Sequence, residues 1–182
     1  MEKGKDSARS DIFVKQNNDI KQWHVLYVRS RHEKALNEEL VEDGYKTYLP
    51  VDKVLKYYSN RKRWVEEPVF KSYLFVKIKR NQLYDLKKNY KYVVSWVKFA
   101  GEPAVVSEKI LLFIKKMILN KFSYEVENGE NIKVGSKIKL KEGAFKGQEG
   151  EIVELRGKKK FVVAIKTIGI KLVLNLSDII PQ

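Results

Sequence analysis

The stretch KEGAFKGQEGEIVEL, Lys141–Leu155, decides the fold that we expect for the C-terminal part of the chain. It begins after an alternating run at 136–140 and ends in a second one at 151–155, and both runs are typical of short strands. Glycine adopts positive φ angles without a steric penalty, so closely spaced glycines indicate a tight loop. Three glycines punctuate this stretch: Gly143, Gly147 and Gly150. The pattern predicts two strands joined by a shaped turn.

Phe145 and Lys146 lie in the middle of this turn. We expect an exposed aromatic ring beside a cation at the tip of the loop. The alternative is an ordinary β-turn whose phenylalanine folds back over the strands. The pattern resembles the KOW motif of NusG-type transcription factors and of some ribosomal proteins.

From residue 135 onward the chain consists of short, glycine-punctuated runs without a helical stretch. Strands are expected at 136–140, 151–155, 161–165 and 171–174, with a final piece near Ile179. This spacing predicts a small all-β barrel over 135–182.

The preceding part, 23–119, alternates between strand and helix patterns. Predicted strands lie at 23–28, 45–51, 72–78, 92–99 and 103–106, and predicted helices at 31–43, 82–88 and 107–119. Residues 53–58 and 63–69 flank the polar sequence SNRK at 59–62, which predicts a protruding basic hairpin. We expect Asn81 and Ser107 to cap the last two helices. This order predicts an α+β domain, in which helices pack on an antiparallel sheet.

Two polar segments complete the organisation. Residues 1–22 contain few apolar side chains and are predicted to be a disordered tail. Residues 120–134 are polar and contain an Asn-Gly pair, so we interpret them as a linker.

The chain of 182 residues carries a formal charge of +14, with a sequence pI near 9.7. The segment 23–119 contains 20 basic and 11 acidic residues, and the segment 135–182 contains 10 and five. Such charge favours nucleic-acid phosphates or acidic protein surfaces as partners. The chain has no cysteine, which excludes disulfides and thiolate metal sites. No secretory signal or membrane span is recognisable, so we expect a cytoplasmic protein.

Catalysis has little support in the sequence. The only histidines, His24 and His32, lack neighbours that would complete a metal site, and we expect no metal and no cofactor. Phosphate-binding loops, dinucleotide fingerprints and nucleophile elbows do not occur. We therefore expect no catalytic residues.

Aromatic residues gather on strands that are expected to be neighbours. Alternation places Tyr73, Phe75 and Lys77 on one face of their strand and Leu74 and Val76 on the other. An aromatic face that no helix covers is a candidate docking surface. The alternative is that a helix covers it.

Four segments follow one another in an order that is itself informative: WHVLYV at 23–28, RHEKALNEEL at 31–40, YLPV at 48–51 and WVEEPVFKSYLFV at 64–76. With the KOW-like end, this order resembles the NusG family over 23–182. The segment YSNRKRWVEEPVF at 58–70 resembles specialised paralogues of the UpxY and LoaP type more than housekeeping NusG.

The resemblance implies a factor that rides on RNA polymerase during elongation and docks on its clamp helices. The implied polymerase-binding residues are Tyr48, Leu49, Pro50, Phe70, Tyr73 and Phe75. The family often has Phe-Pro-Gly-Tyr where this chain has Phe-Lys-Ser-Tyr at 70–73. This departure alters the turn that carries the contact.

The resemblance also implies partners for the remaining motifs. Phe145 and Lys146 would bind Rho, a ribosomal protein or RNA. Candidate contacts with DNA or nascent RNA are the basic residues of the hairpin and of the turn at 156–160: Arg61, Lys62, Arg63, Arg156, Lys158, Lys159 and Lys160. For the hairpin, an ordinary solvated charged loop is the alternative.

We predict a monomeric, non-enzymatic, operon-specific elongation or antitermination factor. The alternatives are a ribosomal-type RNA-binding protein, a housekeeping NusG and an enzyme acting on nucleic acid. The order of motifs over 23–76 counts against the ribosomal protein, and no catalytic pattern supports the enzyme.

Overall fold

The computed structural model describes residues 20–128, 136–141, 145–155 and 158–179. The chain forms two compact units. One contains Met1–Leu49 and Lys71–Val105, and the other contains Pro50–Phe70 and Val106–Gln182. The predicted tail falls almost entirely on residues 1–19, which lie outside the described part.

The first unit is built on an antiparallel sheet with the order β2-β5-β1-β6. Its strands are β1 (Gln22–Val28), β2 (Lys46–Tyr48), β5 (Tyr73–Ile78) and β6 (Val93–Trp96), and β9 (Val105–Val106) also pairs with β1. Strands β1 and β5 pair from Gln22 opposite Ile78 to Tyr27 opposite Tyr73.

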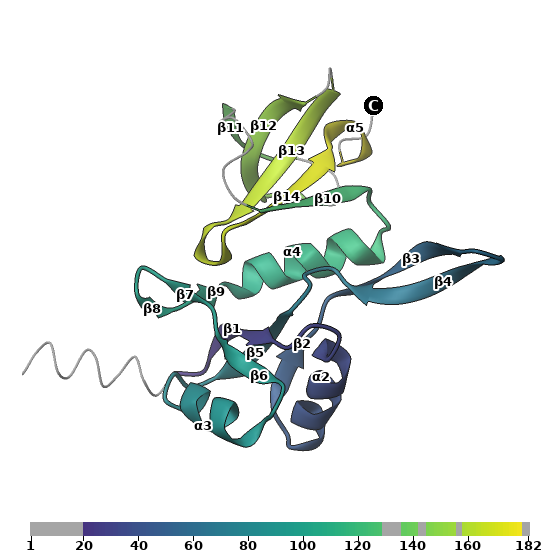
Figure 1. Ribbon diagram of the computed structural model, residues 1–182. Helices are drawn as coiled ribbons and strands as arrows, with labels where there is room; N and C mark the ends of the chain where they lie inside the picture. The colour runs from purple at the N-terminus through teal and green to yellow at the C-terminus, as the bar shows by residue number, and fades with distance from the viewer. Residues whose placement is uncertain (1–19, 129–135, 142–144, 156–157, 180–182) are drawn as a thin grey trace, which may run out of the picture. The chain divides into compact units, whose positions relative to one another are not determined.

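Two helices, α2 (Glu33–Glu42) and α3 (Gln82–Asn89), lie on the same side of this sheet (Figure 1). Their apolar side chains form one core with the facing side chains of the sheet. The core includes Leu26, Leu36, Leu40, Leu74, Val76, Ile78, Leu83 and Leu86. The predicted α+β architecture and the predicted alternation along β5 are therefore confirmed.

A short hairpin in the same unit joins β7 (Lys98–Phe99) to β8 (Glu102–Pro103). Ala100 and Gly101 connect the strands with φ angles of 50° and 84°. Two consecutive positive φ angles are the geometry of a tight two-residue hairpin turn, which explains the glycine.

The second unit contains a longer hairpin, a helix and a sheet (Figure 1). The hairpin pairs β3 (Val51–Tyr58) with β4 (Arg61–Pro68), and the helix is α4 (Glu108–Leu119). Ser107 caps α4, since its Oγ accepts a hydrogen bond from the Ile110 N–H. That predicted cap is confirmed. The predicted Asn81 cap of α3 is wrong, because Asn81 is itself helical and makes no such bond.

The C-terminal sheet is antiparallel, with the order β10-β14-β13-β12-β11. It comprises β10 (Tyr124–Asn128), β11 (Ser136–Lys139), β12 (Glu149–Leu155), β13 (Lys158–Ile165) and β14 (Ile170–Asn175). A 3₁₀ turn (Lys166–Ile168) joins β13 to β14, and a short helix, α5 (Leu176–Ile179), follows β14. An all-β C-terminal part was predicted, and the sheet agrees with it.

Two predictions need correction here. Residues Tyr124–Asn128 were interpreted as linker, yet they form β10 and pair with β14 along its length. The final piece near Ile179 was expected to be extended, but it belongs to α5. The rest of the proposed linker, 129–134, lies outside the described residues.

Gly150 lies within β12 rather than in the turn before it. A Cβ atom at this position would lie 2.5 Å from the ring of Phe161 and 2.6 Å from the carbonyl oxygen of Val162. Both distances are shorter than real contacts, and Phe161 is fully buried. Glycine is therefore required here for close packing of β12 on β13.

Candidate binding surfaces

The face of the first sheet opposite α2 and α3 carries three partly exposed tyrosines, Tyr27, Tyr48 and Tyr73, which we call the tyrosine face. Tyr27 and Tyr73 are cross-strand partners, and their rings meet edge to face with centroids 6.1 Å apart. Tyr27 is 44% exposed. Sequence reasoning missed it, although the alternation in WHVLYV places it on this face.

Tyr48 lies directly opposite Phe75 across the pairing of β2 and β5. The ring centroids are 6.2 Å apart. Phe75 is fully buried, whereas Tyr48 is half-buried, and burial raises the pKa of the Tyr48 hydroxyl to about 12. Phe75 therefore lies beside Tyr48 on this face, but it is fully buried and offers no exposed surface of its own.

The remaining predicted docking residues, Leu49, Pro50 and Phe70, are not part of the tyrosine face. Leu49 packs on the helix-side core, because alternation turns it away from Tyr48. Pro50 and Phe70 belong to the second unit and are both buried there. They lie at the base of the β3–β4 hairpin, where the Val69 N–H donates a 2.8 Å hydrogen bond to the Pro50 carbonyl.

The turn before Tyr73 is tight although this chain has Lys71-Ser72 where the family often has Pro-Gly. Ser72 adopts a φ of 63°, a left-handed conformation that glycine normally supplies. Its N–H donates a 2.7 Å hydrogen bond to Oε1 of Glu33, and its carbonyl accepts a bond from the Val28 N–H. Glu33 is 4% exposed. A buried carboxylate thus holds a serine in the conformation that the tyrosine face needs.

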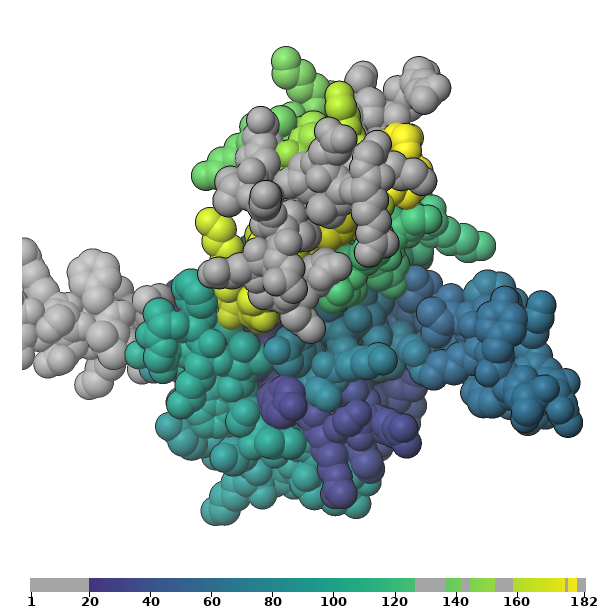
Figure 2. Space-filling model, turned by 45° about the horizontal axis from the view of Figure 1, so that its top comes forward, coloured from purple at the N-terminus to yellow at the C-terminus, as the bar shows by residue number. Residues whose placement is uncertain are grey.

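The β3–β4 hairpin (residues 51–68) presents Arg61, Lys62 and Arg63, all exposed. The predicted hairpin is present, but Arg61 and Lys62 lie in β4 and not in its turn as predicted, because only Ser59 and Asn60 connect the strands. Exposed aromatic side chains accompany them: Tyr57, Tyr58 and Trp64. In Figure 2 the hairpin is the blue segment, and its side chains project from the surface along its length.

The second basic turn is described only in part. Arg156 lies outside the described residues, and the side chain of Lys158 does too. Lys159 is exposed. Lys160 is half-buried, and its ammonium donates a 2.7 Å hydrogen bond to Oδ1 of Asn175 and lies 3.4 Å from Glu125 Oε1. Lys160 therefore contributes to the C-terminal sheet itself.

Phe145 was expected to be exposed, and this expectation is wrong. Its ring is 3% exposed and lies between Phe113 of α4 and Phe122, with centroid distances of 4.7 and 4.9 Å. Lys146 beside it is exposed. Phe113 on the apolar side of α4 packs against the Phe145 ring. The loop sequence alone does not indicate this contact.

Backbone hydrogen bonds hold this segment, Phe145–Gln148, which we call the Phe145 loop. The Gly147 N–H donates to the Leu140 carbonyl at 2.7 Å, and the Gln148 N–H donates to the Phe145 carbonyl at 2.9 Å. Gly147 has a φ of 82°, as the glycine pattern predicted for the turn. Gly143 lies outside the described residues.

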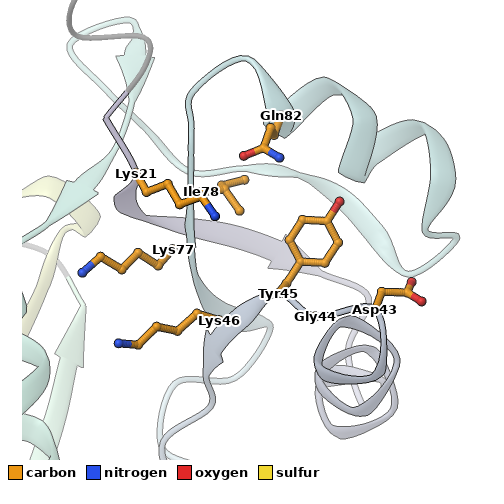
Figure 3. A pocket seen from close by; sticks show the side chains of 8 residues that line it. All are labelled: Lys21, Asp43, Gly44, Tyr45, Lys46, Lys77, Ile78 and Gln82. Carbon is orange, nitrogen blue, oxygen red and sulfur yellow. The ribbon is translucent and has the colours of Figure 1, made fainter.

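Three lysines, Lys21, Lys46 and Lys77, are among the eight residues that line a cavity of about 410 Å³ in the first unit. Lys46 and Lys77 are cross-strand partners, and each ammonium lies 5.9 Å from the centroid of the Trp23 ring. In Figure 3 both side chains extend in the same direction, away from Tyr45. These two cations extend toward Trp23 instead of converging on the cavity, so they do not form an enclosed anion site.

Both histidines have structural surroundings. His24 is buried, its Nδ1 lies 3.1 Å from the Ala104 carbonyl oxygen, and burial lowers its pKa below 6.5. His32 stacks on Tyr92 with a centroid distance of 4.3 Å. Within the described ranges, no three His, Asp or Glu residues cluster in a way that could hold a metal ion. None of the described helices is long and apolar enough to cross a membrane.

The helix-backed antiparallel sheet and the C-terminal β-sheet define a two-part, basic, strand-rich protein. Residues 21–115 match the family model described as NusG, transcription termination factor nusG. This segment spans more than half of the chain, and the chain belongs to the NusG family. A solved structure described as "Domain interaction in Thermotoga maritima NusG" is 23% identical, with a TM-score of 0.48; 86% of this chain and 94% of that one are covered.

The chain is therefore a transcription elongation or antitermination factor, as members of the family are. RNA polymerase is the kind of partner that the family binds.

Proposed function

We propose that the chain is a specialised, operon-specific factor that docks on the clamp helices of RNA polymerase through its first unit. The observation that carries this proposal is the tyrosine face, three partly exposed rings on a rigid sheet in the segment that matches the family. Buried Phe75 lies beside Tyr48 on the same face and supports its ring, which reduces the entropy lost on binding.

Charge at the edge of the tyrosine face supports an acidic partner. Lys46 and Lys77 lie on the same side of the sheet as Tyr48 and Tyr73, since cross-strand partners share a face. Aromatic anchors with a basic rim complement a coiled coil that carries acidic residues at its margin. Phe75 would then support Tyr48 within this face and Leu49 would support it from the helix-side core, whereas Pro50 and Phe70 would hold the base of the β3–β4 hairpin in the second unit.

For nucleic acid, we propose contacts through Arg61, Lys62 and Arg63, with Arg156 and Lys158–Lys160 as a second set. Lys159 and the three hairpin cations are exposed and can neutralise phosphates. Lys160 is the weakest member of the set, because its ammonium is already held by Asn175.

Phe145 and Lys146 would bind the second partner, which is Rho, a ribosomal protein or RNA. The Phe145 ring must leave Phe113 and Phe122 before such a partner can cover it. Lys146 is exposed without this change and can make the first contact. The proposed role is to tether that partner close to the elongating polymerase, which raises its local concentration.

The test is binding of the purified full chain to core RNA polymerase at moderate salt. A Tyr48→Ala/Tyr73→Ala variant should bind roughly 30-fold more weakly, as expected when central aromatic anchors are truncated. Tyr84→Ala is the matched control, because Tyr84 is 71% exposed but lies on α3. Equal weakening of both variants, or of neither, would contradict docking through the tyrosine face.

The rival function is a ribosomal-type RNA-binding protein, and a housekeeping NusG role is a variant of the proposed one. Tight binding to ribosomal RNA without any affinity for polymerase would favour the rival. Genome-wide occupancy distinguishes the other two, since a specialised factor occupies few operons whereas a housekeeping factor occupies most transcribed genes.

A further inference from the structure

Strand register divides the β3–β4 hairpin into two faces of different character. Leu55 pairs with Trp64 and Tyr57 pairs with Lys62, and cross-strand partners point to the same side. One face therefore carries Tyr57, Lys62 and Trp64. The other carries Tyr58 with Arg61 and Arg63 by the same alternation.

The aromatic rings of the first face are open to solvent. Tyr57 is 71% exposed and Trp64 is 65% exposed, whereas Trp23 in the first unit is 7% exposed. Lys62 Nζ lies 5.1 Å from the Tyr57 ring centroid, within the range of a cation–π contact. The exposed rings of Tyr57 and Trp64, with the Lys62 ammonium over the Tyr57 ring, form a surface on which planar groups can stack.

The charge along the hairpin indicates which kind of ligand would supply these planar groups. From Lys53 to Arg63 the hairpin carries five basic residues and no acidic one. Its acids, Asp52, Glu66 and Glu67, lie at the base: Asp52 accepts a 2.8 Å hydrogen bond from the Tyr124 hydroxyl, and Glu67 pairs with Lys56. The distal half is thus positive and aromatic together, which suits a polyanion that carries planar rings.

We propose that the β3–β4 hairpin binds single-stranded nucleic acid, with bases stacked on Tyr57 and Trp64 and phosphates held by Lys62 on the same face, while Arg61 and Arg63 on the opposite face add positive charge that attracts the strand. This inference deepens the nucleic-acid contact in the proposed function and rests on it. Bases in a duplex are already stacked on one another, so only an unpaired strand can use both rings and cations. If the hairpin instead binds a protein, the test below should show no binding to any oligonucleotide.

The experiment measures binding of the full chain to labelled oligonucleotides without polymerase. The probes are single-stranded oligothymidine DNA and oligouridine RNA of about 12 nucleotides, which is within the usual site size, and a duplex of equal length. Fluorescence anisotropy gives Kd over a series of salt concentrations. Tryptophan emission is recorded in parallel, because Trp64 is the exposed tryptophan.

Trp64→Leu is the decisive variant, since leucine keeps an apolar partner for Leu55 but has no aromatic ring. We expect Kd for the single strand to rise roughly 5- to 100-fold, the usual effect of losing one stacked base. Trp64→Phe should restore much of the binding. Phe99→Leu is the matched control, because Phe99 is a half-exposed ring on the β7–β8 hairpin.

Lys62→Gln separates charge from stacking. It should lower the dependence of log Kd on log salt concentration by about 0.7, the value for one phosphate contact with a single strand. Trp64→Leu should leave that slope unchanged.

Three results would overturn the inference: undiminished binding by Trp64→Leu, equal affinity for duplex and single strand, or no binding to any oligonucleotide. Polymerase binding is measured separately with each variant. If Trp64→Leu retains polymerase but loses the single strand, both proposals stand. If polymerase binding fails while the single strand binds, the docking proposal alone is lost.

Discussion

The Phe145 loop and the β3–β4 hairpin carry the same local signal, an aromatic residue close to a cation, but the structure treats them in opposite ways. Phe145 is 3% exposed between two other phenylalanines, whereas Tyr57 is 71% exposed. The difference lies in what surrounds each segment. Phe145 packs on Phe113 of α4, whereas the hairpin is a two-stranded sheet whose aromatic side chains Tyr57, Tyr58 and Trp64 are exposed. An aromatic beside a cation therefore identifies a binding candidate, and tertiary packing decides whether it is presented.

The largest effect should come from truncating the buried ring. Phe145→Ala removes the contacts with Phe113 and Phe122 and leaves a cavity, so the free energy of unfolding should fall by about 3–5 kcal/mol. Tyr57→Ala is the matched change at the exposed site and should stay within about 0.5 kcal/mol. Urea denaturation of both variants measures the difference. If the two substitutions lowered the free energy of unfolding by similar amounts, the proposed contrast between a buried Phe145 and an exposed Tyr57 would be wrong.

Close packing behind the Phe145 loop provides the next test. Gly150→Ala forces a Cβ against the buried ring of Phe161 and the Val162 carbonyl, and should destabilise by about 3 kcal/mol. Gly147→Ala has open space around the new methyl group but a φ of 82°, so strain of only about 1 kcal/mol is expected. Thermal unfolding ranks the two, and a larger effect at Gly147 would contradict this packing.

The turn under the tyrosine face should respond to its buried carboxylate. Glu33→Ala leaves the Ser72 N–H without its acceptor, and the expected loss of stability is about 2 kcal/mol. Ser72→Gly relieves the positive φ and should stabilise the parent chain by about 0.5–1 kcal/mol. Chemical denaturation checks both values. Neutral behaviour of Glu33→Ala would show that this bond does not support the turn.

The smallest effect concerns pH. Burial lowers the pKa of His24 below 6.5, so the folded chain binds fewer protons than the unfolded chain as the pH falls through that value. Stability is complete above pH 6.5 and declines below it, by at most about 1.4 kcal/mol per pH unit from this residue. His24→Asn retains a donor for the Ala104 carbonyl but does not titrate. Its unfolding free energy should fall less between about pH 7.5 and 5.5, and an unchanged slope would contradict the assignment.

Most of the fold could be predicted from local patterns. Alternation placed Leu74 and Val76 against the helices, and the Ser107 cap followed from its position before an apolar stripe. Strand β10 was missed because its residues, YEVEN, are polar enough to resemble a linker, and only pairing with β14 makes them a strand. Long-range pairing of this kind leaves a weak local signal.

The candidate surfaces were less predictable. Burial of Phe145 depends on Phe113 and Phe122, which lie more than 20 residues away in the sequence. Ser72 adopts a left-handed conformation that glycine normally supplies, and Glu33 on α2 accepts a hydrogen bond from its N–H. Both outcomes result from tertiary contacts, and no local motif encodes them. By contrast, the basic hairpin was predictable, since its cations are contiguous in the sequence.

Aromatic NMR of the chain labelled in its Phe, Tyr and Trp rings, before and after addition of a single-stranded oligonucleotide, tests the central contrast most directly. The account predicts nuclear Overhauser contacts of Phe145 with Phe113 and Phe122 that persist throughout the titration. It also predicts that only the Tyr57 and Trp64 signals shift as the oligonucleotide binds. Missing Phe145 contacts, or oligonucleotide shifts at Phe145 with none at Trp64, would contradict it.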